Sequence, residues 1–493
     1  IDVGVIKEKR KETMSTGEED GEPLSPMARV FQLPGNDCCI ITVIGCKTKI
    51  NADVIRSGLN QNVFKHPRFS SKLSRDGLSW IKTQVNIEDH IFVADKDQNE
   101  IAEDGELFVE DYVSRLTMIP LDKSRPLWDI HILNVKTSDA DAVCVIRSHH
   151  SLGDGTSLMS LLAACTQTTS HRDKATIPAL KRRKRVYKDK VSWFVRLILA
   201  IFSSVRLIWN TFVDLVLLLA IAVFLKDTKT PLKGDVGVES SPKKLCHRTV
   251  SLDDLRVIKE AMSMTINDVL LGVTQAALSR YLNNFPGKIR LTAGVFVNLR
   301  PDKGIQVRNV HTSSLKYSKN TEIFSLPLAD MMAKNSKCRW GNYFSSISFP
   351  ISICLEADPL VYLSKAKSAM DRRKHSLLPA LAFSSTEFIF NTFGAKLGGT
   401  LLKRLVSNTT TFISNMIGPT DEISFHGHPI VYIAPSVYGH AHALTIHFLS
   451  YAEKMVISIA VDPNVIPSPH QLCDEIEDSL KAIKAALLER GLL

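Results

Sequence analysis

The chain has 493 residues, of which 44% are hydrophobic and 23% are charged, an ordinary composition for a globular protein with room for two hydrophobic cores. Its nine cysteines are scattered and include no CxxC pair, which argues against a disulfide framework and against a zinc site and indicates a reducing compartment. The net charge is +10 at pH 7, and much of the excess is local.

The first segment of the chain is polar. Residues 1–21 carry the charged run 7–10 and most of the acidic run 18–22, which predict a disordered N-terminus without a signal peptide. Because the first residue is Ile1, we expect a short N-terminal piece to precede it.

Strands and helices alternate over residues 22–180. Apolar, β-branched runs predict strands at 40–48, 130–133 and 143–148, and a helix is expected at 52–60. This alternation predicts an N-terminal α/β domain that ends near residue 180.

Residues 181–245 break that alternation. A basic run at 181–185 precedes an apolar stretch at 193–225 that contains Arg206 and Asp214, and a polar linker follows. A single membrane crossing here would place the two halves of the chain on opposite sides, so we expect this segment to lie in the interface or to enter and return as a hairpin. The alternative is a buried helix beside a solvated basic loop. Few aromatic residues accompany the basic run, which argues against nucleic-acid binding.

The remaining chain predicts a second α/β domain over residues 246–493. Helices are expected at 267–282 and 471–488, the second of them amphipathic. Strands are expected at 291–297 and 455–461, and another strand is expected to end at 414.

The segment His149–Gly155 carries the chemistry that the sequence indicates most clearly. It reads His-His-Ser-Leu-Gly-Asp-Gly, between the strand predicted at 142–148 and a helix that starts near 156. Side chains alternate along a strand, so one imidazole can face a cleft while the other supports it. Histidine can accept and return a proton near neutral pH, and the glycines permit a sharp turn.

This pattern resembles the HHxxxDG signature of CoA-dependent acyltransferases, and most of all that of the plant-type bifunctional wax ester synthase/acyl-CoA:diacylglycerol acyltransferase family. Further segments resemble motifs of that family in the same order along the chain: Leu24-Ser25-Pro26, Pro126-Leu127-Trp128, Asn267-Asp268, Asn298-Leu299-Arg300-Pro301, Gly341-Asn342 and Ser414-Asn415-Met416-Ile417-Gly418-Pro419. The resemblance therefore covers residues 22–419.

The resemblance implies an α/β fold of two chloramphenicol-acetyltransferase-like domains with mixed sheets, an interface tunnel and a hydrophobic helical insertion. It implies that His150 faces the tunnel as general base and that His149 supports it. It also implies that Asp154 holds its loop by pairing with an arginine, for which Arg300 is the candidate. Acyl-CoA would enter from one side and the acceptor alcohol from the other, with no cofactor and no metal.

Several other residues are candidates for the site, and some of them have two interpretations. Ser414 and Asn415 are candidates for the oxyanion donor, or they form an ordinary corner after a strand. Asn267 and Asp268 either shape the site or cap a helix after Thr265. Gly155 is expected to support the turn after Asp154. The histidines at 426, 428, 440, 442 and 447 show no metal-ligand pattern and are interpreted as structural or surface groups.

The expected reaction is long-chain acyl transfer from acyl-CoA to a fatty alcohol, which gives a wax ester, with diacylglycerol acylation as the secondary activity. A primarily diacylglycerol-directed enzyme, a transferase for another hydrophobic alcohol and a non-catalytic lipid-binding paralogue are the alternatives. The lack of a Gly-x-Ser-x-Gly elbow argues against a serine-lipase mechanism. We expect contact with a membrane lipid surface on the cytosolic face of the endoplasmic reticulum, with the plasma membrane as the alternative. The sequence predicts neither chain-length preference nor oligomeric state.

Overall fold

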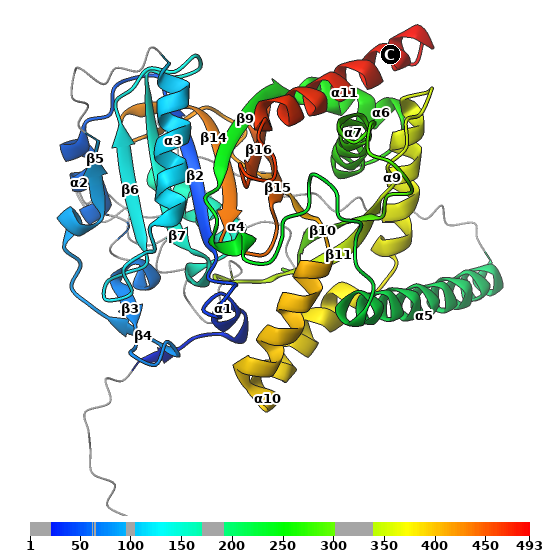
Figure 1. Ribbon diagram of the computed structural model, residues 1–493, viewed down its shortest axis with the longest axis horizontal. Coiled ribbons are helices and arrows are strands. Elements are labelled where there is room, and N and C mark those ends of the chain that lie inside the picture. The colour runs from blue at the N-terminus through cyan, green and yellow to red at the C-terminus, as the bar shows by residue number, and fades with distance from the viewer. Residues whose placement is uncertain (1–20, 62, 64–65, 95–103, 170–191, 301–338) are drawn as a thin grey trace, which may run out of the picture.

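The computed structural model describes residues 21–61, 63, 66–94, 104–169, 192–300 and 339–493. Within these residues the strands form three sheets, and helices cover them to build two packed lobes (Figure 1). The segment 1–20, for which disorder was predicted, and the basic run 181–185 lie outside the described residues.

The first lobe is built on a seven-stranded mixed sheet. The pair β5–β6 is parallel, and the other strand pairs are antiparallel. In spatial order the strands are β5 (Ile91–Val93), β6 (Trp128–Leu133), β7 (Ala142–His149), β2 (Cys39–Cys46), β14 (His428–Tyr438), β13 (Ile423–Phe425) and β8 (Thr166–Thr168).

Both faces of this sheet are buried. Side chains alternate along each strand, so neighbouring residues pack on opposite faces. Ile44 and Cys144 pack with α2 (Ala52–Gln61), α4 (Gly155–Cys165) and a small sheet of β1 (Glu22–Pro23), β4 (Ser79–Lys82) and β3 (Ser71–Leu73). On the opposite face, Val43 and Val145 pack with α3 (Gly105–Met118). These nearly continuous apolar strands explain why the sequence predicted them well.

The second lobe is built on a six-stranded mixed sheet. One face is covered by helices α6 (Leu252–Ala261), α7 (Ile266–Tyr281), α9 (Leu360–Lys374) and α11 (Pro469–Glu489), which share one hydrophobic core with the sheet. In spatial order the strands are β11 (Phe344–Ile351), β10 (Leu291–Asn298), β12 (Thr411–Ile417), β15 (Leu444–Tyr451), β16 (Lys454–Val461) and β9 (Lys244–Ser251).

The C-terminal half of the chain contributes two strands to the first lobe. β13 and β14 belong to the C-terminal part of the chain, yet they complete the sheet of the first lobe, where residues 430–438 of β14 pair with β2. The predicted boundary near residues 180–245 therefore separates the two sheets except for β13 and β14. β14 also packs against β15 and β16, so it forms the junction between the lobes.

Two long helices lie together on one side of the second lobe (Figure 1). The predicted apolar stretch forms α5 (Trp193–Val223), which, among the described residues, is the one helix long and apolar enough to cross a membrane by length and composition. The second helix, α10 (Leu378–Asn408), was not predicted from the sequence. It is broken at Gly394, whose φ of 79° is the left-handed conformation that glycine tolerates.

Candidate active site

The backbone of the histidine pair is held from both sides. β7 ends at His149, and the short 3₁₀ helix η4 (His150–Leu152) follows at once. The His149 amide donates to the Leu127 carbonyl at 2.9 Å, and the His150 amide donates to the Cys38 carbonyl at 2.9 Å. The Pro-Leu-Trp segment thus acts through its backbone to fix the end of β7.

His149 has both ring nitrogens engaged. Its Nε2 lies 2.9 Å from Oδ1 of Asp37, and its Nδ1 accepts the Ser151 amide at 3.2 Å. The side chain of Gln32 also contacts Nδ1, at 3.2 Å. His149 is buried, so this arrangement orients the loop and leaves the ring no free nitrogen for chemistry.

His150 is held differently, with one nitrogen bound and the other free. Nδ1 lies 3.1 Å from Oδ1 of Asn342, while Nδ2 of Asn342 donates to the His150 carbonyl at 2.9 Å. Because that amide NH₂ group is the donor, Oδ1 accepts, and the proton of a neutral His150 resides on Nδ1. No described residue makes a hydrogen bond to Nε2, which is therefore left with a lone pair.

The surroundings keep His150 neutral. Burial lowers its pKa to about 4, so the imidazole is uncharged at neutral pH. Phe31 stacks on the ring with centroids 4.1 Å apart, and Phe344 lies at 5.6 Å. Phe31 follows α1 (Pro26–Val30), whose N-cap Ser25 belongs to the Leu-Ser-Pro segment.

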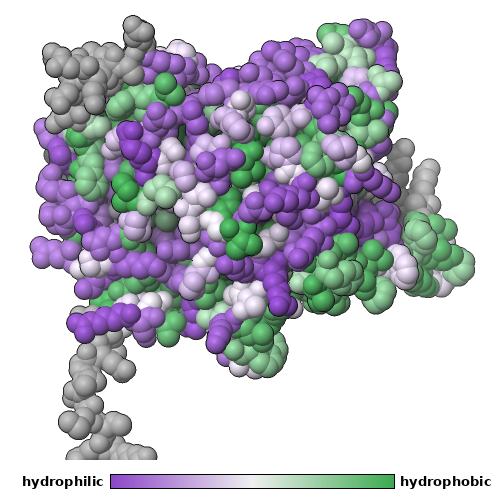
Figure 2. Space-filling model, viewed as in Figure 1, coloured by the Kyte–Doolittle hydropathy of each residue, from purple (hydrophilic) through white to green (hydrophobic). Residues whose placement is uncertain are grey.

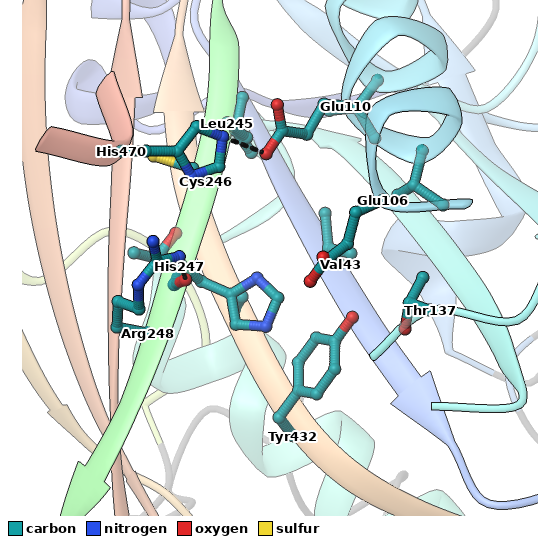
Figure 3. Close-up of a pocket in the computed structure, with 14 residues that line it drawn as sticks. Val43, Glu106, Glu110, Thr137, Leu245, Cys246, His247, Arg248, Tyr432 and His470 are labelled. Carbon is teal, nitrogen blue, oxygen red and sulfur yellow. Dashed lines mark hydrogen bonds and ion pairs between the residues drawn. The ribbon is translucent and has the colours of Figure 1, made fainter. Parts of the chain in front are cut away.

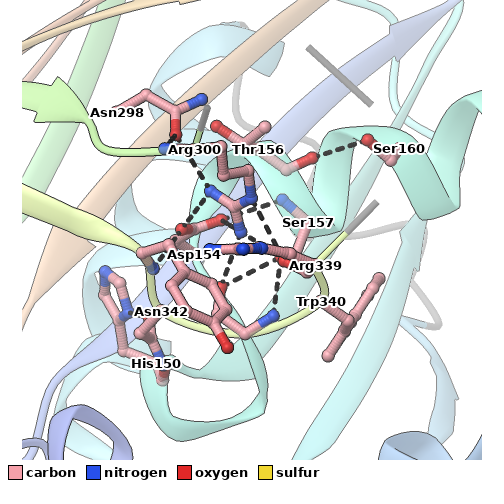
Figure 4. Close-up of polar contacts among 12 residues, drawn as sticks. His150, Asp154, Thr156, Ser157, Ser160, Asn298, Arg300, Arg339, Trp340 and Asn342 are labelled. Carbon is pink, nitrogen blue, oxygen red and sulfur yellow. Dashed lines mark hydrogen bonds and ion pairs between the residues drawn. The ribbon is translucent and has the colours of Figure 1, made fainter. Parts of the chain in front are cut away.

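Asp154 is buried in a dense network that joins the two lobes (Figure 4). Arg300, its predicted partner, forms a two-point ion pair with it, from Nη1 to Oδ2 at 2.8 Å and from Nη2 to Oδ1 at 3.0 Å. Asp154 also caps α4 by accepting the Ser157 amide, and it accepts the Tyr343 amide at 3.0 Å. Arg300 Nη2 donates to the Gly341 carbonyl as well, so the pair fixes the segment that carries Asn342.

Gly155 and Ser414 lie at the lobe junction. A Cβ on Gly155 would come within 2.4 Å of Sδ of Met416, so a glycine lets β12 approach the start of α4. Ser414 precedes Met416 by two positions and shares its strand face, and it pairs in register with His447. Asn415 lies on the opposite face of β12, away from the first lobe. The side chains of Ser414 and Asn415 therefore point to different regions.

His447 was interpreted as structural or surface from the sequence, and the structure buries it at the lobe junction. Burial, and to a smaller extent the nearby His150 imidazole when protonated, lowers its pKa to about 4. Its Nδ1 lies 3.5 Å from the hydroxyl of Ser436. His447 is thus a neighbour of the catalytic candidate that no motif signalled.

Asp268 caps a helix. Thr265 and Asp268 form a capping box at the start of α7, and Nζ of Lys374 lies 2.8 Å from Oδ1 of Asp268. The contacts of Asp268 all lie within the helical layer of the second lobe, and Asn267 is half-buried beside it. The structure does not bring these two residues to His150.

A pocket lined by both polar and apolar side chains opens between the lobes, away from the histidine pair (Figure 3). Tyr432 packs against His247 there, with ring centroids 4.2 Å apart, and His470 pairs with Glu110 at 2.9 Å. Val43 lines this pocket and is paired with Val145, four residues before His149. Among the described residues, no group of histidine, cysteine or carboxylate side chains could hold a metal ion.

Solved structures share this two-lobed fold. A wax ester synthase/diacylglycerol acyltransferase from Marinobacter aquaeolei VT8 matches 95% of this chain and 100% of its own, with a TM-score of 0.56 and 17% identity. The TRI3 trichothecene 15-O-acetyltransferase from Fusarium sporotrichioides matches 96% of this chain and 97% of its own, with a TM-score of 0.54 and 12% identity. At these identities the two matches show a shared fold.

Sequence comparison is more specific. The model of the wax ester synthase/diacylglycerol acyltransferase catalytic domain matches residues 49–270, and the model of the WS/DGAT C-terminal domain matches residues 340–484. Arabidopsis thaliana wax ester synthase/diacylglycerol acyltransferase 7 is 57% identical over 97% of this chain and 100% of its own length. Wax ester synthase/diacylglycerol acyltransferase 10 of the same plant is 56% identical over 96% of this chain and 99% of its own length. The chain belongs to the wax ester synthase/diacylglycerol acyltransferase family and is an O-acyltransferase.

Replacing Asn342 tests whether it fixes the tautomer of His150. Asn342→Leu removes the acceptor for Nδ1–H, and we expect kcat to fall roughly tenfold to a hundredfold with little change in KM. Asn342→Asp keeps an acceptor and adds a negative charge, which should raise the pKa of His150 and move the acid limb of the pH–rate profile upward by about 1 to 2 units. Unchanged pH profiles in both variants would contradict this role.

Buried neutral histidines predict acid sensitivity of the fold. Burial lowers the pKa of His66 and His442 to about 3 and that of His150 and His447 to about 4. Because their unfolded pKa is about 6.5, the stability they contribute is complete above that pH and is lost as the pH falls towards the folded values. In urea unfolding, the free energy of unfolding should fall as the pH drops below about 6.5, with a slope that approaches at most about 1.4 kcal/mol per pH unit for each histidine near pH 5. A free energy of unfolding that does not change over this pH range would contradict the prediction.

Proposed function

We propose that this protein transfers a long-chain acyl group from acyl-CoA to a fatty alcohol, giving a wax ester, and acylates diacylglycerol as a second activity. The single observation that carries the proposal is a buried, neutral imidazole whose Nδ1 is bound to Asn342 and whose Nε2 receives no hydrogen bond from any described residue. The family names of the relatives supply the acceptor classes.

The reaction needs one proton carrier. Nε2 of His150 accepts the proton of the acceptor hydroxyl as the alcohol oxygen attacks the thioester carbonyl. The tetrahedral intermediate then collapses, the carbon–sulfur bond breaks, and the proton on Nε2 passes to the departing CoA sulfur. His150 returns to its starting state, and no covalent intermediate with the protein forms.

Stabilisation of the oxyanion would come from the second lobe. Ser414 lies on the β12 face that carries Met416, which contacts the start of α4. Its hydroxyl is a candidate donor to the developing oxyanion, in an environment where a single preorganised donor contributes substantially. We assign no such role to Asn415, which lies on the other face of the strand. The proposed proton transfer and acyl transfer use no metal or cofactor.

Membrane contact accompanies the proposed activity, because both acceptors are lipids. α5 exposes large apolar side chains along its length, among them Trp193 at 74% and Phe202 at 67% exposure. Such a helix, beside the basic run that precedes it in the sequence, suits attachment to a lipid surface. We propose that the protein acts at the cytosolic face of the endoplasmic reticulum, where acyl-CoA is available.

A substrate panel tests the proposal. Purified protein is given labelled acyl-CoA of several chain lengths with hexadecanol, with diacylglycerol or with both in competition. We expect wax ester to exceed triacylglycerol in the competition. Triacylglycerol in excess would favour the diacylglycerol reaction as primary. The absence of both products would overturn the proposal in favour of a lipid-binding protein.

A further inference from the structure

The apolar surface of the molecule is concentrated on α5 and α10. The two helices pack against each other, and Figure 2 shows hydrophobic side chains gathered over both of them. On α10 the large exposed apolar residues are Leu381, Phe388, Phe393, Leu397 and Leu401. Elsewhere on the molecule exposed apolar residues are scattered, whereas on these two helices they form one continuous surface. Such a surface indicates a binding partner.

The pattern on α5 identifies the partner as lipid. Successive residues of a helix point about 100° apart, so consecutive apolar positions face every direction. A folded protein partner covers one face of a helix, whereas hydrocarbon surrounds it. Eight residues of the first part of α5 each expose 44% or more of their surface: Trp193, Phe194, Val195, Leu197, Ile198, Leu199, Ile201 and Phe202.

Two polar residues in the second part of α5, Asn210 and Asp214, face the protein, whereas Arg196 and Arg206 are exposed. Asp214 is buried and lies 2.5 Å from Nη2 of Arg372, and the amide of Asn210 donates to the carbonyls of Arg372 and His375 at 3.1 Å. These contacts tie the second part of α5 to the end of α9. A helix held in this way lies along the surface of its own protein and does not cross a bilayer independently.

α10 connects this surface to the active site. A Cβ on Gly399 would come within 2.7 Å of Leu33, so α10 packs closely on the turn that follows Phe31. Phe383 of α10 also stacks on Tyr343, with centroids 6.2 Å apart, directly beside Asn342. α10 thus contacts both segments that supply the neighbours of His150.

We propose that α5 and α10 form one platform embedded in the hydrocarbon of a membrane leaflet, and that the long-chain alcohol passes from the leaflet to His150 beside α10, where this helix meets the segment of Phe31. This inference rests on the proposed function, because it concerns how that acceptor arrives. It assigns to α10 a part in substrate delivery in addition to attachment.

Two variant pairs test the platform. Phe388→Asp with Phe393→Asp changes α10, and Phe202→Asp with Val205→Asp changes α5; these side chains are 59% to 67% exposed, so folding should be unaffected. Leu488→Asp, at a 56% exposed position of α11, is the matched control. Each protein is floated with vesicles of phosphatidylcholine and phosphatidylserine, and ester formation is measured with hexadecanol in those vesicles and in detergent micelles.

We expect both pairs to float about tenfold less than the wild type, and the ratio of vesicle rate to micelle rate to fall about tenfold. The control should keep the wild-type values. Normal flotation of the α10 pair would overturn the platform, and reduced flotation with an unchanged rate ratio would overturn the delivery route. A wild type that floats but makes no ester in micelles would instead contradict the proposed function.

Discussion

His150→Ala should lower ester formation by roughly 10²- to 10⁴-fold, the usual contribution of a positioned general base. The imidazole is neutral because burial lowers its pKa to about 4, and its free Nε2 is the atom that can take the hydroxyl proton. Without it, the acceptor must lose its proton to water in a site lined by Phe31 and Phe344. The protein itself should remain folded.

The measurement uses purified wild type and variant with labelled acyl-CoA and hexadecanol. His90→Ala is the matched control, because His90 is also buried in the first lobe, where its ring stacks on Trp128, and no hydrogen bond joins it to His150. Equal activity of wild type and His150→Ala would falsify the mechanism. An equal loss in both variants would show that any missing buried ring disturbs the fold.

Breaking the pair between Asp154 and Arg300 should mainly affect stability. Removing one partner of a buried ion pair leaves a charge without compensation, which typically costs about 3–5 kcal/mol. We expect Asp154→Asn and Arg300→Met each to lower the free energy of unfolding by about this amount. Both side chains are almost fully buried, so solvent cannot compensate the remaining charge.

A double-mutant cycle in urea separates the pair from its surroundings. The double variant should lose clearly less than the sum of the two single losses, because no unpaired charge remains. Activity should fall as well, since Arg300 holds the Gly341 carbonyl and Asp154 holds the Tyr343 amide on either side of Asn342. Full folding and full activity of Asp154→Asn would contradict the assignment.

Strong local patterns made much of the fold predictable. The strands at β2, β7, β10 and β16 are apolar on both faces and fell within two residues of their expected ends. α10 was missed because its apolar residues follow no single stripe and Gly394 interrupts it. β14 contains Pro429 and Pro435, which argue against a central strand, and its pairing partner is hundreds of residues away.

The active site also has a part that the sequence could predict and a part that it could not. The histidine pair and the cap at Thr265 are local features, and the sequence pattern indicated both. The bond between His150 and Asn342 joins residues 192 positions apart, so no local signal could reveal it. The motif containing Gly341 and Asn342 was noticed by resemblance, but its role depends on the packing of two lobes. The same holds for Phe31 and His447.

Because β13 and β14 complete the sheet of the first lobe, the enzyme cannot be divided simply into an N-terminal and a C-terminal half. A fragment that ends before residue 423 would leave the hydrogen-bonding edge of β2 bare, and such open edges invite aggregation. The remaining piece would carry two strands without a sheet of their own. Neither half is therefore an independent folding unit, and chimaeras between relatives should keep residues 423–438 together with the histidine-bearing half.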